Sequence, residues 1–341
     1  MNQTDNKCFV RDLPEKIRVS VGSAAVLGLL NCKLDVPPTA VHLMTYSTAH
    51  CLANCSFCSQ ANKSNSNSLL LSRISWPEFQ TSNVIISIKK AYLDGIVKRV
   101  CLQALNYLDV FTHLNAIVSA IKHFSAIPIS VSCQPGNLEN ILQLVNFGAD
   151  RIGIPIDVAT KQLFTNIKGE NVGGPYKWAT QFEKLRSAVK IFGEGNVSTH
   201  LIIGLGESEK EVLAVIQHLT DLGILSALFA FTPIRGTRLE TLGRPSIESY
   251  RRIQLAKYLI DDGVVSFDKL GFNNFDQLVG YGIDKSLLCK IVEFGTPFRT
   301  SGCPDCNRPF YNERPSGPLF NFPRALKEIE IAKIKQLLCL E

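Results

Sequence analysis

The sequence predicts an α/β fold, a complete or partial TIM-type (β/α) barrel of parallel strands with an N-terminal helix and a C-terminal extension. Short runs rich in Val, Ile and Leu alternate with segments of helical periodicity through the middle of the chain. Six such units in succession favour a parallel sheet whose strands are joined by helices. The 341 residues are enough to bury a full core.

The predicted strands are 40–47, 97–104, 127–134, 150–157, 197–206 and 226–235. The predicted helices between them are 75–96, 109–125, 137–149, 177–192 and 208–223.

The flanking segments have different patterns. "VSVGSAAVLGLL" (19–30) is predicted to be a packed helix, because a membrane span needs about 18 apolar residues. From residue 264 the pattern loosens into a stretch rich in Gly, Pro, Arg and aromatic residues. We therefore expect an N-terminal helical segment (1–38), a barrel (39–263) and a C-terminal extension (264–341) that folds over the barrel mouth.

The composition restricts the functional class. Hydrophobic residues make up 45% and charged residues 19%, which is typical of a soluble globular protein. The net charge of +6 is too small to indicate nucleic-acid binding by itself. No membrane span is expected, and a cytoplasmic location is predicted. Eleven cysteines, an odd number, do not suggest a disulfide scaffold, whereas clustered thiols in a reducing compartment often hold metal.

Three cysteines follow the first predicted strand with the spacing C-x3-C-x2-C: Cys51, Cys55 and Cys58. A structural zinc site usually takes four ligands, often from two C-x2-C pairs. A zinc knuckle is the alternative interpretation of these three cysteines. Three thiolates leave one metal of an iron–sulfur cube free to chelate a small molecule. Barrel chemistry is placed at the carboxyl ends of the strands, where this loop begins.

This spacing, together with the β/α series, resembles the radical S-adenosylmethionine (SAM) superfamily. The resemblance implies a 4Fe–4S cluster on the three cysteines, which passes an electron to SAM. The 5′-deoxyadenosyl radical so released abstracts hydrogen from an unactivated carbon. The cofactor carries the chemistry, while the protein binds, orients and excludes water.

The same resemblance implies further cofactor-binding positions. They are Phe57 beside the cluster, Asp157 in "IGIPIDVA", Gly204 and Glu207 in "IIGLGES", and Thr232 and Arg235 in "TPIRGTRLE". Asp157 matches a ribose-binding carboxylate of biotin synthase, with a helix N-cap as the alternative. The usual glycine-rich second-strand motif is absent, because "CLQALN" (101–106) stands in its place.

Other cysteines resemble the ligands of a second cluster. Cys101 and Cys133 match strand positions of biotin synthase that hold a sacrificial sulfur source, but Ser198 replaces the third cysteine of that set. Cys303 and Cys306 of "CPDC" are expected to complete an auxiliary 4Fe–4S cluster. The alternatives are inert buried thiols on the strands and half of a zinc site in the tail.

The tail narrows the resemblance. "FRTSGCPDCNRPFYNERPSGPLFNFPR" resembles the biotin-synthase-related radical SAM proteins, which include the two-component lipoyl synthases, and the likeness spans roughly 35–325. It implies a sulfurtransferase acting on an octanoylated lipoyl carrier protein. The implied partners are a paralogous second component and an electron donor such as ferredoxin or flavodoxin.

Tail side chains are candidates for substrate contact, although ordinary surface and packing roles explain them equally well. A basic rim for an acidic carrier is predicted at Arg299, Arg308, Arg314 and Arg324. An acyl tunnel is predicted at Phe310, Tyr311, Phe320 and Phe322.

Three rival functions remain. One is a biotin-synthase-like enzyme that inserts sulfur into dethiobiotin or another small molecule. Another is a radical SAM mutase or methylase whose auxiliary cluster transfers electrons. The third is a catalytically silent iron–sulfur scaffold, which would not need the adenine-binding motifs.

Overall fold

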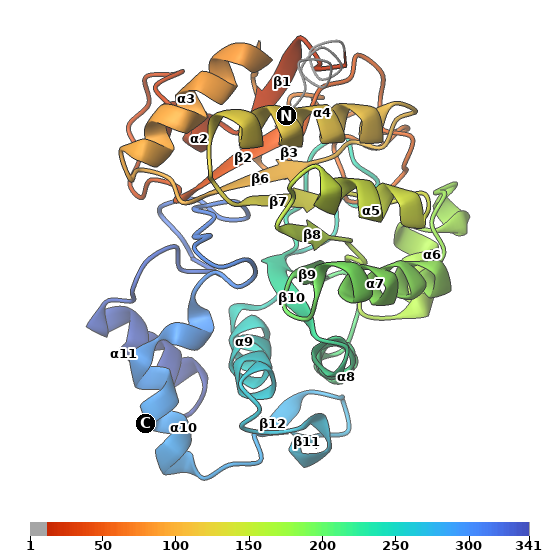
Figure 1. Cartoon of the computed structure of the whole chain (residues 1–341). Helices are drawn as coiled ribbons and strands as arrows, with labels where there is room; N and C mark the ends of the chain where they lie inside the picture. Colours follow the sequence, from red (N-terminus) through yellow and green to blue (C-terminus); the bar gives the residue numbers. More distant parts are fainter. Residues whose placement is uncertain (1–11, 341) are drawn as a thin grey trace.

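The computed structural model describes residues 12–340 and has a mixed α/β fold around one eight-stranded sheet (Figure 1). The strand order is β10-β9-β8-β7-β6-β2-β1-β5. The parallel strands are β2 (Ala40–Thr45), β6 (Arg99–Gln103), β7 (Ile129–Ser132), β8 (Arg151–Gly153), β9 (Val197–Ile203) and β10 (Ile224–Ala230). The predicted series of six parallel strands is thus confirmed. β1 (Lys16–Val19) and β5 (Glu78–Gln80) extend one edge in antiparallel pairing.

Helices follow the parallel strands and cover the outer face of the sheet. They are α3 (Thr81–Leu93), α4 (Val110–Phe124), α5 (Leu138–Asn146), α6 (Lys161–Ile167), α7 (Trp178–Phe192), α8 (Glu209–Asp221) and α9 (Ile247–Asp261). Side chains of a strand alternate between its two faces. On β6, Val100 and Leu102 join the main hydrophobic core, whereas Cys101 and Gln103 face an inner cavity.

The sheet curves without closing. Within residues 12–340, β10 pairs only with β9, so a complete barrel is not formed. Met44 of β2 and Phe229 of β10 nevertheless line the same cavity. Strands at the two ends of the parallel run therefore bend around one space, which several of the predicted site residues line.

The N-terminal segment differs from the prediction. Residues 1–11 lie outside the described part of the chain. In the remainder, the helix predicted over 19–30 is limited to α2 (Val21–Val26), and β1 precedes it. Ile17 and Val19 are buried, and β1 pairs with β2 on one side and β5 on the other. No helix in the described residues has the length and apolar character needed to cross a membrane.

The C-terminal segment contains a hairpin and two helices that Figure 1 shows away from the sheet. They are β11 (Gly271–Phe272), β12 (Leu278–Gly280), α10 (Lys285–Phe294) and α11 (Glu328–Leu337). The small hairpin after the cysteine loop comprises β3 (Leu70–Leu71) and β4 (Ile74–Ser75).

The tail between α10 and α11 runs along the open side of the curved sheet. The Leu228 N–H of β10 donates to Ser301 Oγ at 3.0 Å. The Thr39 N–H, just before β2, donates to Asn307 Oδ1 at 2.9 Å. Arg73 then donates to the Phe310 carbonyl at 3.0 Å. The tail thus bridges the two ends of the parallel run.

Candidate active site

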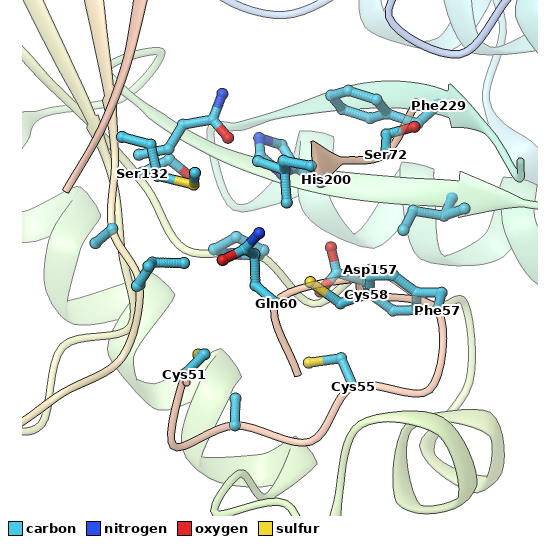
Figure 2. A pocket seen from close by; sticks show the side chains of 18 of the residues that line it. Cys51, Cys55, Phe57, Cys58, Gln60, Ser72, Ser132, Asp157, His200 and Phe229 are labelled. Atoms are coloured by element: carbon cyan, nitrogen blue, oxygen red, sulfur yellow. The ribbon is translucent and has the colours of Figure 1, made fainter. Parts of the chain in front are cut away.

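A cavity of about 250 Å³ lies on the inner face of the sheet. Its walls come from β2, β6, β7, β9, β10, the loops that follow them and the tail. Figure 2 shows the cysteine loop on one side of this space and Ser132, His200 and Phe229 on another.

The three loop cysteines all line this cavity and are free thiols. The turn is closed by the Cys58 N–H, which donates to the Cys55 carbonyl at 3.0 Å. The Asn106 N–H donates to Cys51 Sγ at 3.2 Å. Figure 2 shows the sulfurs of Cys55 and Cys58 turned into the same space, with Cys51 across it. The loop therefore presents three thiols to one cavity.

Burial raises the thiol pKa of two of the loop cysteines. It raises the pKa of Cys58 to about 12 and also raises that of Cys55, against the opposing effect of the Lys168 ammonium. Metal binding would deprotonate such thiols outright. In the described residues, no three His, Cys, Asp or Glu side chains gather around a point that suits one metal ion.

Polar side chains hold the cysteine loop in place. Asn54 donates to the Val172 carbonyl, and its Oδ1 accepts from the Lys63 N–H at 3.1 Å. Gln60 donates to the Ser68 carbonyl at 2.7 Å. Both side chains are buried, so their bonds fix the loop geometry.

Asp157 faces the cavity but is not a helix cap. Thr160 caps α6 instead, and Asp157 adopts a left-handed φ of 67°. Its Oδ2 lies 2.5 Å from Lys168 Nζ, and both side chains are buried. Lys168 Nζ also lies 5.3 Å from the centre of the Tyr176 ring. Lys168 and Tyr176 line the cavity, yet no sequence motif identified them.

The other predicted cofactor positions divide into two groups. Phe57 and Thr232 line the cavity, whereas Gly204, Glu207 and Arg235 do not. Arg235 is exposed. Glu207 accepts from the N–H groups of Gly204 and Leu205 at 2.6 and 3.0 Å, and burial raises its pKa. Gly204 and Glu207 of "IIGLGES" therefore shape the turn. Ile202 is the residue of this motif that faces the cavity.

A second cysteine group lies deeper, around β6. Cys101 lies in the middle of β6 rather than at its end, and it lines the cavity. The neighbouring Cys303 and Cys306 contribute, after burial, to raising its thiol pKa. Cys303 Sγ accepts from Ser130 Oγ at 3.5 Å. Cys306 Sγ lies 3.7 Å from Nε2 of His42.

Cys133 lines the same cavity as Cys101 but lies apart from the row that meets Cys303 and Cys306. Cys101 pairs with Ser130 across β6 and β7, and Cys133 follows Ser130 by three residues. At about 3.3 Å per residue, this offset is about 10 Å along the strand direction. Cys133 is also part of the main hydrophobic core. The buried-thiol alternative fits it better.

The tail arginines do not form one rim. Arg308 is directed inward: it lines the cavity, and its guanidinium carbon lies 3.9 Å from the centre of the Phe229 ring. Arg324 pairs with Glu330 at 2.8 Å. Arg299 and Arg314 are exposed.

The predicted aromatic tunnel is likewise reduced. Tyr311 is the one of the four aromatic residues that lines the cavity, and Phe310 does not. Phe320 and Phe322 are buried in the main core, where Phe322 packs against the Arg251 guanidinium at 5.0 Å.

No family model matches the chain, and no curated protein matches it. Among solved structures, it resembles the FeFe-hydrogenase maturase HydG from Carboxydothermus hydrogenoformans, with 16% identity, a TM-score of 0.49, and coverage of 63% of this chain and 49% of that one. Methylornithine synthase (PylB) has 14% identity and a TM-score of 0.49, with 76% and 82% covered. Another HydG structure has 13% identity and a TM-score of 0.48, with 65% and 50% covered. The chain spans about half the length of these HydG chains.

Proposed function

We propose that this chain is a radical SAM enzyme that inserts sulfur into a protein-bound octanoyl chain. Cys51, Cys55 and Cys58 would hold the first 4Fe–4S cluster. The donor set fits, because three free thiols line one cavity and one sulfur accepts a backbone N–H. When bound, the cluster and SAM supply one-electron cleavage of the sulfonium and abstraction of a hydrogen atom from carbon.

Side chains around the loop support a place for SAM. Phe57 and Ile202 offer apolar surfaces to an adenine ring, and Asp157 offers a carboxylate for ribose hydroxyls. Lys168 lies 2.5 Å from this carboxylate and fixes its position through their buried contact. The cavity wall excludes water from the reacting carbon.

One observation carries the proposal of sulfur insertion: the three-cysteine loop and Cys101 line the same cavity. Replacing a C–H bond by a C–S bond removes one hydrogen atom and needs, beside the same carbon, a sulfide source that also accepts the one electron released when the carbon radical bonds to sulfide. Cys101, Cys303 and Cys306 would hold a second cluster as that source. A substrate in the cavity would then lie between the two groups.

The cavity wall favours an acyl chain as substrate. Met44, Leu105, Val110, Phe229 and Tyr311 supply apolar surface. A saturated chain gains about 0.8 kcal/mol for each CH₂ group that it buries. We propose the octanoylated lipoyl carrier as substrate, a paralogous component for the second sulfur, and a ferredoxin or flavodoxin as electron donor.

The test is product analysis with anaerobically reconstituted protein, SAM and a chemical reductant. Octanoylated carrier domain, with and without the paralogous component, is compared with dethiobiotin by mass spectrometry. Alone, the protein should add one sulfur atom to the octanoyl chain or require a chain that already has one. Cys101→Ala should still form 5′-deoxyadenosine but lose sulfur transfer.

Three results would contradict this proposal. Conversion of dethiobiotin to biotin would replace the acyl substrate with a small molecule. Hydrogen abstraction without any sulfur transfer would make the second cluster an electron carrier. Full lipoylation by this protein alone would exclude the two-component assignment.

A further inference from the structure

We infer that His42 is the fourth ligand of the second cluster, with Cys101, Cys303 and Cys306 as the other three. The inference rests on the proposed function for the nature of the group, an iron–sulfur cluster. Its evidence is the arrangement of these four side chains.

The strand register places His42 and Cys101 side by side. His42 pairs with Cys101 across β2 and β6, and Cys101 pairs with Ser130 of β7. Paired residues of parallel strands point to the same face, and adjacent strands lie about 4.8 Å apart. The three side chains therefore form one row across the inner face of the sheet.

The "CPDC" turn docks against this row. Ser130 Oγ donates to Cys303 Sγ at 3.5 Å, and Arg99 Nε donates to the Pro304 carbonyl at 3.2 Å. On the other side, Thr39 Oγ1 donates to the Asp305 carbonyl at 2.5 Å. Contacts from residues on or next to three adjacent strands thus position both tail sulfurs.

The His42 imidazole has the orientation of a metal ligand. The ring hydrogen-bonds the backbone of Ala40, and Nε2 lies 3.7 Å from Cys306 Sγ. Histidine ligands usually donate their second ring N–H to a carbonyl or carboxylate, which fixes the tautomer and turns the other nitrogen toward the metal. His42 is only 6% exposed, so this arrangement is held inside the protein.

Charge also favours this set. A neutral imidazole with three thiolates carries one negative charge fewer than four thiolates, which reduces the cost of burial. The Arg308 and Arg99 guanidiniums lie close enough to lower the pKa of Cys101 against the effect of burial. Iron–sulfur clusters accept imidazole in place of thiolate on individual irons, and this substitution raises the reduction potential.

The test uses the full chain with Cys51, Cys55 and Cys58 replaced by Ala, so that only the second cluster can form. The protein is reconstituted with iron and sulfide, reduced, and labelled with ¹⁵N-histidine. About four irons per chain and a ¹⁵N hyperfine coupling in electron–nuclear double resonance are expected. His42→Cys should keep the iron, lose the coupling and lower the reduction potential.

Cys133→Ala is the matched control in the same background, and it should keep both iron and coupling. Absence of the coupling, its survival in His42→Cys, or its loss in Cys133→Ala would overturn the inference. So would zinc instead of iron in the site. These readouts need no substrate, so the nitrogen coupling in this background, together with no activity in the chain that keeps Cys51, Cys55 and Cys58, would contradict the proposed function and leave the ligand set standing.

Discussion

Asp157 and Lys168 form a buried ion pair in the wall of the cavity, with Asp157 Oδ2 2.5 Å from Lys168 Nζ. Lys168 Nζ also donates to the Pro155 carbonyl at 2.5 Å. The pair joins the end of the β8 segment to the end of α6. The Lys168 ammonium also lies near Cys55. It lowers the pKa of the Cys55 thiol against the larger effect of burial. One lysine therefore serves both the carboxylate and the cysteine loop.

Lys168→Met is expected to destabilise the protein by about 3–5 kcal/mol, because it leaves the Asp157 carboxylate buried without its partner. The double variant Asp157→Asn with Lys168→Met should lose less, since no charge remains. Urea unfolding of the apoprotein measures both. Lys210→Met, which removes the exposed pair with Asp276, is the control and should cost about 0–1 kcal/mol. Equal losses in Lys168→Met and Lys210→Met would contradict the buried role.

Replacement of Cys51, Cys55 and Cys58 by Ala is expected to abolish formation of 5′-deoxyadenosine from SAM. The reason is that the cluster would lose every protein ligand while the fold keeps its core. The readout is chromatography of the products after anaerobic reconstitution. Cys32→Ala removes an exposed thiol and should leave the yield unchanged. Undiminished SAM cleavage in the triple variant would refute the radical SAM proposal.

Gly204→Ala is expected to destabilise the protein by about 1–3 kcal/mol, because φ at this position is +104°. An added Cβ would also lie 2.8 Å from Pro245 Cδ. Gly243→Ala is the matched control, since nothing lies within 4 Å of its added Cβ. Thermal unfolding compares the two. A loss in Gly204→Ala no larger than that in Gly243→Ala would show that the turn tolerates a side chain.

The apoprotein is expected to lose stability as pH falls from about 6.5 to about 4, partly through His200. Burial lowers the pKa of His200 to about 4 from 6.5, against the opposing Asp157 carboxylate. The folded state therefore binds fewer protons than the unfolded state in this window. The contribution of neutral His200 to stability is complete above about pH 6.5. It is lost as the pH falls from about 6.5 to about 4.

His200→Gln should flatten that pH dependence, as measured by urea unfolding at several pH values. The exposed His123→Gln is the control and should leave the slope unchanged. Identical slopes in all three proteins would contradict the assignment.

The order of strands and helices was predictable, because hydrophobic periodicity is a local property and each β/α unit carries its own pattern. The three-cysteine loop was predictable for the same reason, since its cysteines lie within eight residues. The N-terminal strand was missed because its pairing with β2 and β5 comes from distant parts of the chain.

The sequence by itself determined which residue types are available: three thiols in one loop, two in the tail, and strands to carry the rest. The tertiary structure alone decided which of them meet. Strand register put His42 beside Cys101 and left Cys133 three residues beyond Ser130, the residue that pairs with Cys101. Chain folding brought Lys168 to Asp157 and turned Arg308 inward. The spacing of residues in the sequence shows only which residues are close along the chain. Which residues meet across the sheet depends on the register between separate strands.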